Sequence, residues 1–190
     1  MIDLKILVTS SRPGRVGPVL ARWIEPLARA HGEFRVTVVD LAELNLPFMD
    51  EPNHPMKKDY QHDHTKAWSR LVDEADAFLI LAAEYNHGFT AVFKNAVDYL
   101  FQEWKNKPVA FVGYGGVAGG TRSIQMMKPV LSGLGMVPLT EAVYLPFFRN
   151  QFDAPGEFVP TEDQNKAAGA MLNALARWAV ALRPLRSLSQ

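Results

Sequence analysis

The chain alternates between short apolar runs and longer segments in which apolar residues recur every three or four positions. The short runs are rich in β-branched and aromatic residues, which is typical of buried strands in parallel sheets. The longer segments have the spacing of amphipathic helices. The pattern predicts five strands, over residues 5–10, 34–39, 77–82, 109–113 and 136–141. It also predicts five helices, from residue 16 to about 31, around 67–72, over about 90–104, through 126–134 and after 160.

Strands that alternate with helices predict a doubly wound α/β sheet with helices on both faces. Residues 1–184 are expected to form one domain, and residues 185–190 a flexible tail. Residues 41–64 are rich in Pro, His, Asp and Lys, and they predict a surface excursion rather than a second domain. In the last helix, Thr161 and Gln164 match a capping box.

Composition narrows the class of protein. The 190 residues contain 20 basic and 20 acidic side chains and no cysteine. A formal charge of zero argues against a strongly basic nucleic-acid binder or a protein bound to anionic membranes, and it favours self-association. Without a cysteine thiolate, redox chemistry would have to reside on a bound cofactor. The chain has no apolar run of the ~18 residues that a membrane span needs, and it begins without a signal-peptide pattern. We therefore expect a soluble, cytoplasmic protein.

The loop after the first strand, residues 10–17, has the chemistry of an anion site. Ser10 supplies a hydroxyl, Arg12 and Arg15 supply guanidinium groups, and the loop leads into the start of a helix. Helix N-termini and arginines both bind phosphate oxygens well. The loop lacks the Gly-Lys-Ser/Thr ending of a nucleotide P-loop, so a phosphate monoester is favoured over a triphosphate. The alternative is an ordinary helix start with solvated arginines.

The loop after the third strand, from Glu84 to Gly88, concentrates polar and aromatic side chains. Tyr85 offers an aromatic face, and backbone amides in this loop are suited to bind the polar edge of a planar heterocycle. No Gly-x-Ser-x-Gly motif lies beside His87, which argues against a serine hydrolase. The alternative is a plain strand-to-helix connection that is capped by Asn86.

The loop after the fourth strand contains a glycine-rich motif, from Gly113 to Ala118, that matches the dinucleotide-binding fingerprint. That fingerprint normally opens the first half of a two-half sheet, whereas only one further strand follows here. A dinucleotide diphosphate site is therefore disfavoured. The glycines are expected to allow a tight turn or the close approach of a flat ring.

The excursion carries His62, His64 and several carboxylates, which are potential metal ligands. The two histidines are one residue apart in an irregular loop, without the helical spacing or the cysteine partner of common zinc sites. We therefore expect solvated side chains here and no metal.

Taken in order, the three loops resemble the NAD(P)H-dependent FMN reductase family of flavodoxin-like proteins, which includes quinone and azo-dye reductases. The family motif in the second loop is Pro-Glu-Tyr-Asn, and this chain has Ala83 in place of the proline, so a less rigid loop is expected. The resemblance is carried by residues 9–18 (Thr-Ser-Ser-Arg-Pro-Gly-Arg-Val-Gly-Pro), 84–88 (Glu-Tyr-Asn-His-Gly), 94–99 (Lys-Asn-Ala-Val-Asp-Tyr) and 113–116 (Gly-Tyr-Gly-Gly).

The resemblance implies a five-stranded parallel sheet in the order 2-1-3-4-5 and a bound FMN. It places the FMN phosphate against Ser10, Arg12 and Arg15, with Gly17 and Pro18 supporting the start of the helix. No side chain is expected to act as a catalytic acid or nucleophile, because FMN carries the redox chemistry. The rest of the flavin is expected to contact the second and third loops, through Glu84, Tyr85, Asn86, His87, Gly113, Tyr114, Gly115 and Gly116.

The resemblance also implies a two-electron, ping-pong oxidoreductase that uses NADPH or NADH as co-substrate and reduces flavin, quinone or a similar small acceptor. Family members are dimers or tetramers, so a homodimer or homotetramer is expected. One alternative is a flavodoxin-type electron carrier, which the neutral charge disfavours because such carriers are usually acidic. The other is a flavin-binding, redox-responsive interaction protein.

Overall fold

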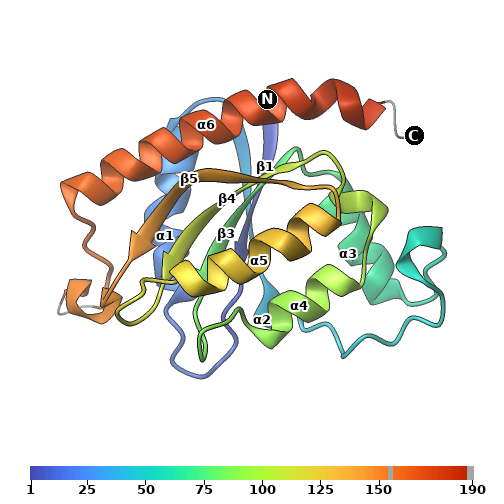
Figure 1. The fold of residues 1–190 in the computed structure, drawn as a ribbon, viewed down its shortest axis with the longest axis horizontal. Coiled ribbons are helices and arrows are strands. Elements are labelled where there is room, and N and C mark those ends of the chain that lie inside the picture. Colours follow the sequence, from blue (N-terminus) through green and yellow to red (C-terminus); the bar gives the residue numbers. More distant parts are fainter. Residues whose placement is uncertain (154–155, 188–190) are drawn as a thin grey trace.

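Five parallel strands form one sheet in the order β2-β1-β3-β4-β5 (Figure 1). The computed structural model describes residues 1–153 and 156–187. This strand order is the flavodoxin-like one of doubly wound folds, so the predicted fold class and strand order are confirmed. The strands are β1 (Ile2–Val8), β2 (Phe34–Asp40), β3 (Ala77–Ala83), β4 (Pro108–Tyr114) and β5 (Val137–Leu145).

Helices cover both faces of the sheet (Figure 1). Among the described helices, none is both long and apolar enough to cross a lipid bilayer. One face carries α1 (Gly17–Ala30) and α6 (Glu162–Ser187), and the other carries α3 (Asp63–Asp73), α4 (Ala91–Asp98) and α5 (Thr121–Gly133). The shorter elements are α2 (Leu41–Leu44) and the 3-10 helices η1 (Pro55–Lys57), η2 (Gln102–Trp104) and η3 (Phe148–Gln151).

The apolar run that predicted the central strand β3 is explained by burial of the strand on both faces of the sheet. All 7 of its residues are buried. Leu79 and Leu81 face α1 and α6, whereas Phe78 and Ile80 face α3, α4 and α5. Because helices cover both faces, neither set of alternating side chains meets water. The strand ends at Ala83, so the second loop begins directly at the edge of the sheet.

The helix predicted over residues 90–104 is shorter than expected. α4 ends at Asp98, and the chain then forms η2 before it enters β4. Trp104 turns into the core, where its ring centroid lies 5.8 Å from that of Trp68. Its indole nitrogen donates a hydrogen bond to the Val97 carbonyl (3.3 Å). The prediction of one continuous helix was wrong, because the burial of Trp104 outweighs local helical propensity.

Three strands match their predicted bounds to within one residue at each end, whereas β1 and β5 differ by more. β1 runs from Ile2 to Val8, so Ser10 lies in the first loop rather than at the end of the strand. β5 continues to Leu145, because its last residues pair with the end of β4 up to Tyr114. The added pairing brings the segment after β5 close to the third loop.

α6 begins with the predicted capping box. The Thr161 hydroxyl accepts a hydrogen bond from the Gln164 amide (3.2 Å), and the Gln164 side chain accepts one from the Thr161 amide (2.8 Å). The helix extends into the segment predicted as a tail, where Arg186 lies 2.5 Å from Asp76. The last part of that segment, residues 188–190, lies outside the described residues.

The excursion between β2 and α3 is held against α4 by polar contacts. Asn95 donates a hydrogen bond to the Pro47 carbonyl (2.7 Å), and the Tyr99 hydroxyl donates one to Asp50 (2.9 Å). The His64 ring bonds to the same carboxylate (3.0 Å). In the part of the chain that the structure describes, no three histidine or carboxylate side chains gather as a metal site requires.

Candidate functional site

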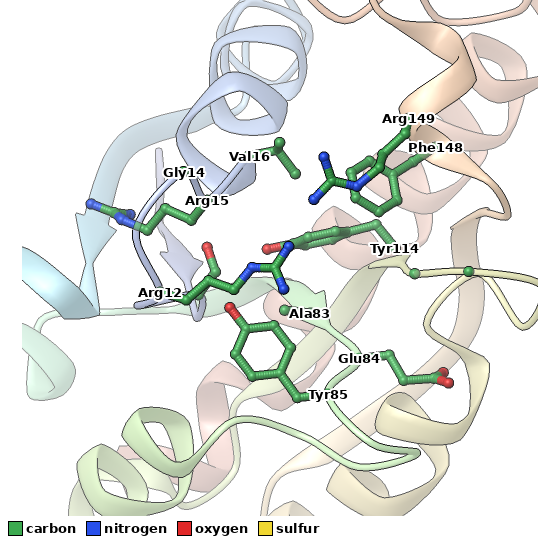
Figure 2. Close-up of a pocket in the computed structure, with 13 residues that line it drawn as sticks. Arg12, Gly14, Arg15, Val16, Ala83, Glu84, Tyr85, Tyr114, Phe148 and Arg149 are labelled. Atoms are coloured by element: carbon green, nitrogen blue, oxygen red, sulfur yellow. The ribbon is translucent and has the colours of Figure 1, made fainter.

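The three loops meet at the carboxyl ends of β1, β3 and β4 (Figure 1). A pocket opens between them, and Figure 2 shows the side chains that line it. In doubly wound sheets, the point at which the strand order reverses is the usual ligand site. Most of the predicted site residues line this pocket, namely Ser10, Arg12, Arg15, Glu84, Tyr85, Tyr114, Gly115 and Gly116. The other lining residues are Gly14, Val16, Ala83, Phe148 and Arg149.

Two neighbouring hydroxyl groups in the pocket lack a well-formed internal hydrogen bond. Ser10 is 1% exposed and Tyr114 is 4% exposed. The Ser10 Oγ and the Tyr114 hydroxyl lie beside each other, and neither makes a well-formed hydrogen bond to another of the described residues. Burial raises the pKa of Tyr114, so this phenol is a neutral donor at physiological pH. An unpaired buried hydroxyl costs about 1–3 kcal/mol, so both groups indicate a ligand that accepts hydrogen bonds here.

Two buried threonines behind the pocket tie the first and second loops together. The Thr9 hydroxyl donates a hydrogen bond to the Leu81 carbonyl (2.7 Å) and accepts one from the Ala83 amide (3.4 Å). The Thr90 hydroxyl donates to the Thr9 carbonyl (2.7 Å). These bonds fix the ends of β1 and β3 relative to each other, and they therefore fix the shape of the pocket.

The start of α1 places a helix N-terminus at the pocket. Gly17 and Pro18, predicted to support the helix start, are its first two residues. A Cβ at Gly17 would lie 2.5 Å from the Ser10 Oγ and 2.7 Å from Val8, so glycine allows the helix to approach the strand this closely. Within the described chain, the N-cap residue Val16 makes no side-chain bond to the helix amides. The helix end is therefore available to a negatively charged group.

The three arginines of the pocket wall have different surroundings. Figure 2 shows Arg15 directed away from the pocket toward β2, where its Nη1 lies 2.5 Å from Asp40. Arg12 and Arg149 are instead directed into the pocket from opposite sides (Figure 2). The Arg12 guanidinium lies 5.9 Å from the centroid of the Tyr85 ring. Arg12 is therefore positioned for a ligand, whereas Arg15 already has a partner.

The second loop is a tight turn. Tyr85 and Gly88 exchange backbone hydrogen bonds (2.9 and 3.0 Å), and between them Asn86 and His87 have φ angles of 48° and 71°. Positive φ at both central residues is typical of a type I′ turn, in which asparagine is favoured because it tolerates this conformation. Tyr85 belongs to the pocket wall, while Asn86 and His87 form the tip of the turn outside it.

Glu84 is paired inside the protein rather than directed at the pocket (Figure 2). Its Oε1 accepts a hydrogen bond from Arg122 Nε (2.6 Å), and its Oε2 accepts one from the Arg122 amide (3.2 Å). Arg122 Nη1 also donates to His87 Nε2 (2.8 Å), which requires the imidazole proton to be on Nδ1 because arginine cannot accept. Arg122 was not predicted, and no sequence motif marks it.

In the third loop, most of the glycines allow two parts of the loop backbone to lie in close contact. A Cβ on Gly113 would lie 2.8 Å from the Gly119 oxygen, and one on Gly120 would lie 2.4 Å from the Tyr114 nitrogen. Gly113 belongs to β4 and lies outside the pocket wall. Gly116 lines the pocket, and a Cβ there would meet no described atom within 4 Å. The fingerprint-like motif is thus explained by a tight turn before α5.

Phe148 and Arg149 complete the pocket from the segment after β5, and neither was predicted. The Phe148 ring packs edge-on against Tyr114, with 5.4 Å between centroids. In the sequence, this segment is only a loop rich in phenylalanine and proline. The available signal was its position, because a segment that follows a fifth parallel strand begins at the same edge of the sheet as the other loops.

Together these features define a site for a planar aromatic molecule that carries an anionic group. The N-terminus of α1, the hydroxyls of Ser10 and Tyr114, and the Arg12 guanidinium suit the anionic group. Tyr85 and Phe148 supply aromatic surface. FMN has both parts, a phosphate monoester and a flat ring system, so the residues present fit it. Fold and site therefore define a flavin-binding protein of the flavodoxin-like class.

Comparison with known proteins identifies the family. The family model for NADPH-dependent FMN reductase matches residues 3–150, and the chain belongs to this family. The NAD(P)H-dependent FMN reductase of Schizosaccharomyces pombe is 38% identical over 151 residues, which are 76% of this chain and 75% of the relative. The 2-hydroxy-1,4-benzoquinone reductase of a Burkholderia species is 28% identical over 187 residues, which are 93% of this chain and 96% of that protein.

A solved structure shares the fold. FerB, a flavoenzyme NAD(P)H:(acceptor) oxidoreductase from Paracoccus denitrificans, aligns with a TM-score of 0.76. The alignment covers 95% of this chain and 98% of FerB at 22% sequence identity. The likeness supports the same fold class as the observed strand order.

Proposed function

We propose that this chain is an NAD(P)H-dependent oxidoreductase that holds FMN in the pocket and reduces quinones or other small acceptors. The observation that carries the proposal is the pair of buried hydroxyls of Ser10 and Tyr114, which lack a well-formed internal hydrogen bond, beside the N-terminus of α1. Membership of the family supports FMN and NAD(P)H as the reactants. The name of the Burkholderia relative supports quinones as one class of acceptor.

The chain's own residues bind and orient the cofactor. Ser10, Tyr114, Arg12 and the Gly17 amide at the start of α1 are suited to hold the phosphate, and Tyr85 is suited to lie against the ring system. The next residues of α1 offer no further amide, because Pro18 has no N–H and the Val19 amide donates to the Val16 carbonyl (3.0 Å). Gly116 leaves room for the ring to approach the backbone closely. FMN held by these residues would supply the redox chemistry, which is hydride uptake from NADPH or NADH and two-electron reduction of an acceptor.

We assign no catalytic acid or base. Glu84 and His87, the carboxylate and the imidazole of the second loop, both bond to Arg122 instead of facing the pocket. Protons taken up together with electrons are therefore expected to come from solvent. Substitutions in the pocket should act mainly through flavin binding, because orientation is what these side chains supply.

We also propose that the chain acts as a homodimer or homotetramer in the cytoplasm, where NADPH and NADH are available. A formal charge of zero removes long-range repulsion between copies. On the excursion beside α4, Phe48 is 85% exposed and Met49 is 38% exposed, and association would bury such apolar side chains. Light scattering at working concentrations tests this part of the proposal, and a monomer would contradict it.

A flavodoxin-type carrier is less favoured. Carriers that dock on basic partner proteins usually have a strongly acidic surface, whereas 20 basic residues balance 20 acidic residues here. A carrier, like a flavin-binding interaction protein, would not by itself turn over NADPH and a quinone.

The test is quinone-dependent oxidation of NADPH and NADH by the purified protein supplied with FMN. We expect sustained turnover that disappears when FMN is removed and returns when it is added back. The same FMN without protein is the control, because free flavin reacts slowly with these reductants. Absence of turnover above that control with both nucleotides would contradict the function.

A further inference from the structure

Of the two arginines that the sequence predicts at the anion end of the pocket, only Arg12 directs its guanidinium inward, although Arg15 also lines the wall (Figure 2). Arg15 Nη1 lies 2.5 Å from Asp40 Oδ2, and both side chains are largely buried, at 19% and 10% exposure. Asp40 is itself fixed at the end of β2, where its Oδ1 accepts a hydrogen bond from the Ala42 amide (3.0 Å). The charge of Arg15 is therefore neutralised, and its guanidinium is directed away from the pocket (Figure 2).

Arg149, from the segment after β5, supplies the second guanidinium group of the pocket (Figure 2). Figure 2 shows the guanidinium groups of Arg12 and Arg149 directed toward each other across the pocket. Each lies over an aromatic ring, Arg12 over Tyr85 at 5.9 Å and Arg149 over Phe148 at 5.5 Å from the ring centroid. Within the described residues, neither guanidinium forms an ion pair. Two cations that face each other without a counterion indicate an anionic ligand between them.

The backbone before Arg149 is shaped to place it there. Phe147 has a φ of 47°, which is rare for a residue with a bulky side chain. This conformation is held by two bonds, from the Phe147 amide to the Gly116 carbonyl (3.0 Å) and from the Asn150 amide to the Phe147 carbonyl (2.9 Å). Backbone conformations of this kind cost about 1–3 kcal/mol and cluster at ligand sites.

We propose that Arg149 and Arg12 together clamp the phosphate of the flavin, and that Arg15 is a positioning residue that ties the first loop to β2. The proposal rests on the proposed FMN site and assigns it a phosphate-binding residue from outside the three loops. Guanidinium groups suit the task, because each can donate two parallel hydrogen bonds to phosphate oxygens.

The test compares the affinities of FMN and riboflavin, which differ only in the phosphate, by quenching of flavin fluorescence. Arg149→Gln is expected to lower the affinity for FMN about 10-fold or more, because a hydrogen bond to a charged group is lost. Its affinity for riboflavin is expected to stay within about 2-fold of that of the wild type. Arg15→Gln is expected to lower the affinity for FMN by less than about 3-fold, because the charge of Arg15 is already paired with Asp40. Arg70→Gln, an exposed arginine on α3, is the matched control.

Unchanged FMN binding by Arg149→Gln would overturn the proposal. So would an equal loss of riboflavin affinity, because that result would assign Arg149 to the ring or to folding. If Arg15→Gln lost as much FMN affinity as Arg149→Gln, the assignment of Arg15 to positioning and of Arg149 to phosphate binding would be overturned. A wild-type protein that binds neither flavin would instead contradict the proposed function itself.

Discussion

Glu84 and Arg122 join the second loop of the site to the first turn of α5. Arg122 Nε donates to Glu84 Oε1 (2.6 Å), and the Arg122 amide donates to Oε2 (3.2 Å). The Glu84 side chain is 4% exposed, so Arg122 rather than bulk water is the partner of its carboxylate. The same guanidinium donates to the His87 ring (2.8 Å). One arginine therefore braces both sides of the tight turn that carries Tyr85.

Replacing Arg122 by alanine is expected to lower the free energy of unfolding by about 1–3 kcal/mol, because Glu84 loses charge-assisted hydrogen bonds. FMN affinity is expected to fall too, since Tyr85 lies on the loop that loses its support. Urea unfolding and FMN titration measure the two effects. Arg70→Ala is the control and should change neither. Wild-type stability in Arg122→Ala would show that the pair does not brace the loop.

Tyr114→Phe separates ligand binding from stability. The Tyr114 hydroxyl lies beside Ser10 and makes no well-formed hydrogen bond to a described residue, so its removal should change the free energy of unfolding by less than about 1 kcal/mol. FMN affinity is expected to fall about 3-fold to 10-fold, because one hydrogen bond to the ligand is lost. Thermal unfolding without FMN and fluorescence titration with FMN give the two quantities.

Tyr99→Phe is the matched control for this prediction. The Tyr99 hydroxyl donates to Asp50 (2.9 Å) and to the Pro47 carbonyl (3.0 Å). Its removal is expected to destabilise the protein by about 1–2 kcal/mol, because these acceptors lose their donor. If Tyr114→Phe were destabilised as much as Tyr99→Phe, the Tyr114 hydroxyl would have an internal partner instead of a ligand.

Gly17→Ala is expected to disturb the phosphate end of the pocket. The new Cβ would lie 2.5 Å from the Ser10 Oγ and 2.7 Å from Val8, so the helix start or the strand must shift. We expect a loss of about 1–3 kcal/mol in stability and weaker FMN binding. Gly169→Ala in α6, where a Cβ meets no described atom within 4 Å, should instead stabilise by about 0.5–1 kcal/mol. Equal stability of the two variants would contradict the close packing at Gly17.

Lys107 provides a pH test that is independent of the pocket. Its buried Nζ donates to the carbonyls of Val72 (2.6 Å) and Asp73 (3.0 Å) at the end of α3. Burial lowers the pKa of Lys107 from the ordinary 10.5 to about 8. Between these pH values the folded chain has lost the proton while the unfolded chain still holds it. Stability contributed by this group therefore increases as the pH rises from about 8 toward 10.5.

When the wild type is compared with Lys107→Met, the pH dependence that comes from all other titratable groups cancels, because both proteins contain those groups. The difference in unfolding free energy should move in favour of the wild type by up to about 1.4 kcal/mol per pH unit above pH 8. Urea unfolding at several pH values measures it. Parallel pH profiles for the two proteins would contradict a lowered Lys107 pKa.

The centre of the sheet was predictable because β3 and β4 are buried along their whole length and therefore appear as unbroken apolar runs. The edge strands β2 and β5 are partly exposed, and their apolar runs are interrupted by polar residues. The end of α4 was not predictable from spacing. Trp104 continues the helical pattern in sequence, but it packs against Trp68, which lies far away in the chain. Only the tertiary contact decides that the helix stops at Asp98.

The loops of the site were predictable because hydroxyl, guanidinium and glycine residues follow the ends of apolar runs. The direction of Arg15 was not, because its partner Asp40 comes beside the first loop only when β2 pairs with β1, with Asp40 opposite Val8. Arg122 and Arg149 were missed for the same reason, since each reaches the site from an element that is distant in sequence.

The central claim is that this pocket binds FMN and allows NAD(P)H to reduce it. The most direct measurement is an anaerobic titration of the FMN-bound protein with NADPH and NADH, followed by the visible absorbance of the flavin. We expect at least one nucleotide to bleach the absorbance and a quinone to restore it. A protein that does not bind FMN, or bound FMN that neither nucleotide bleaches, would contradict the claim.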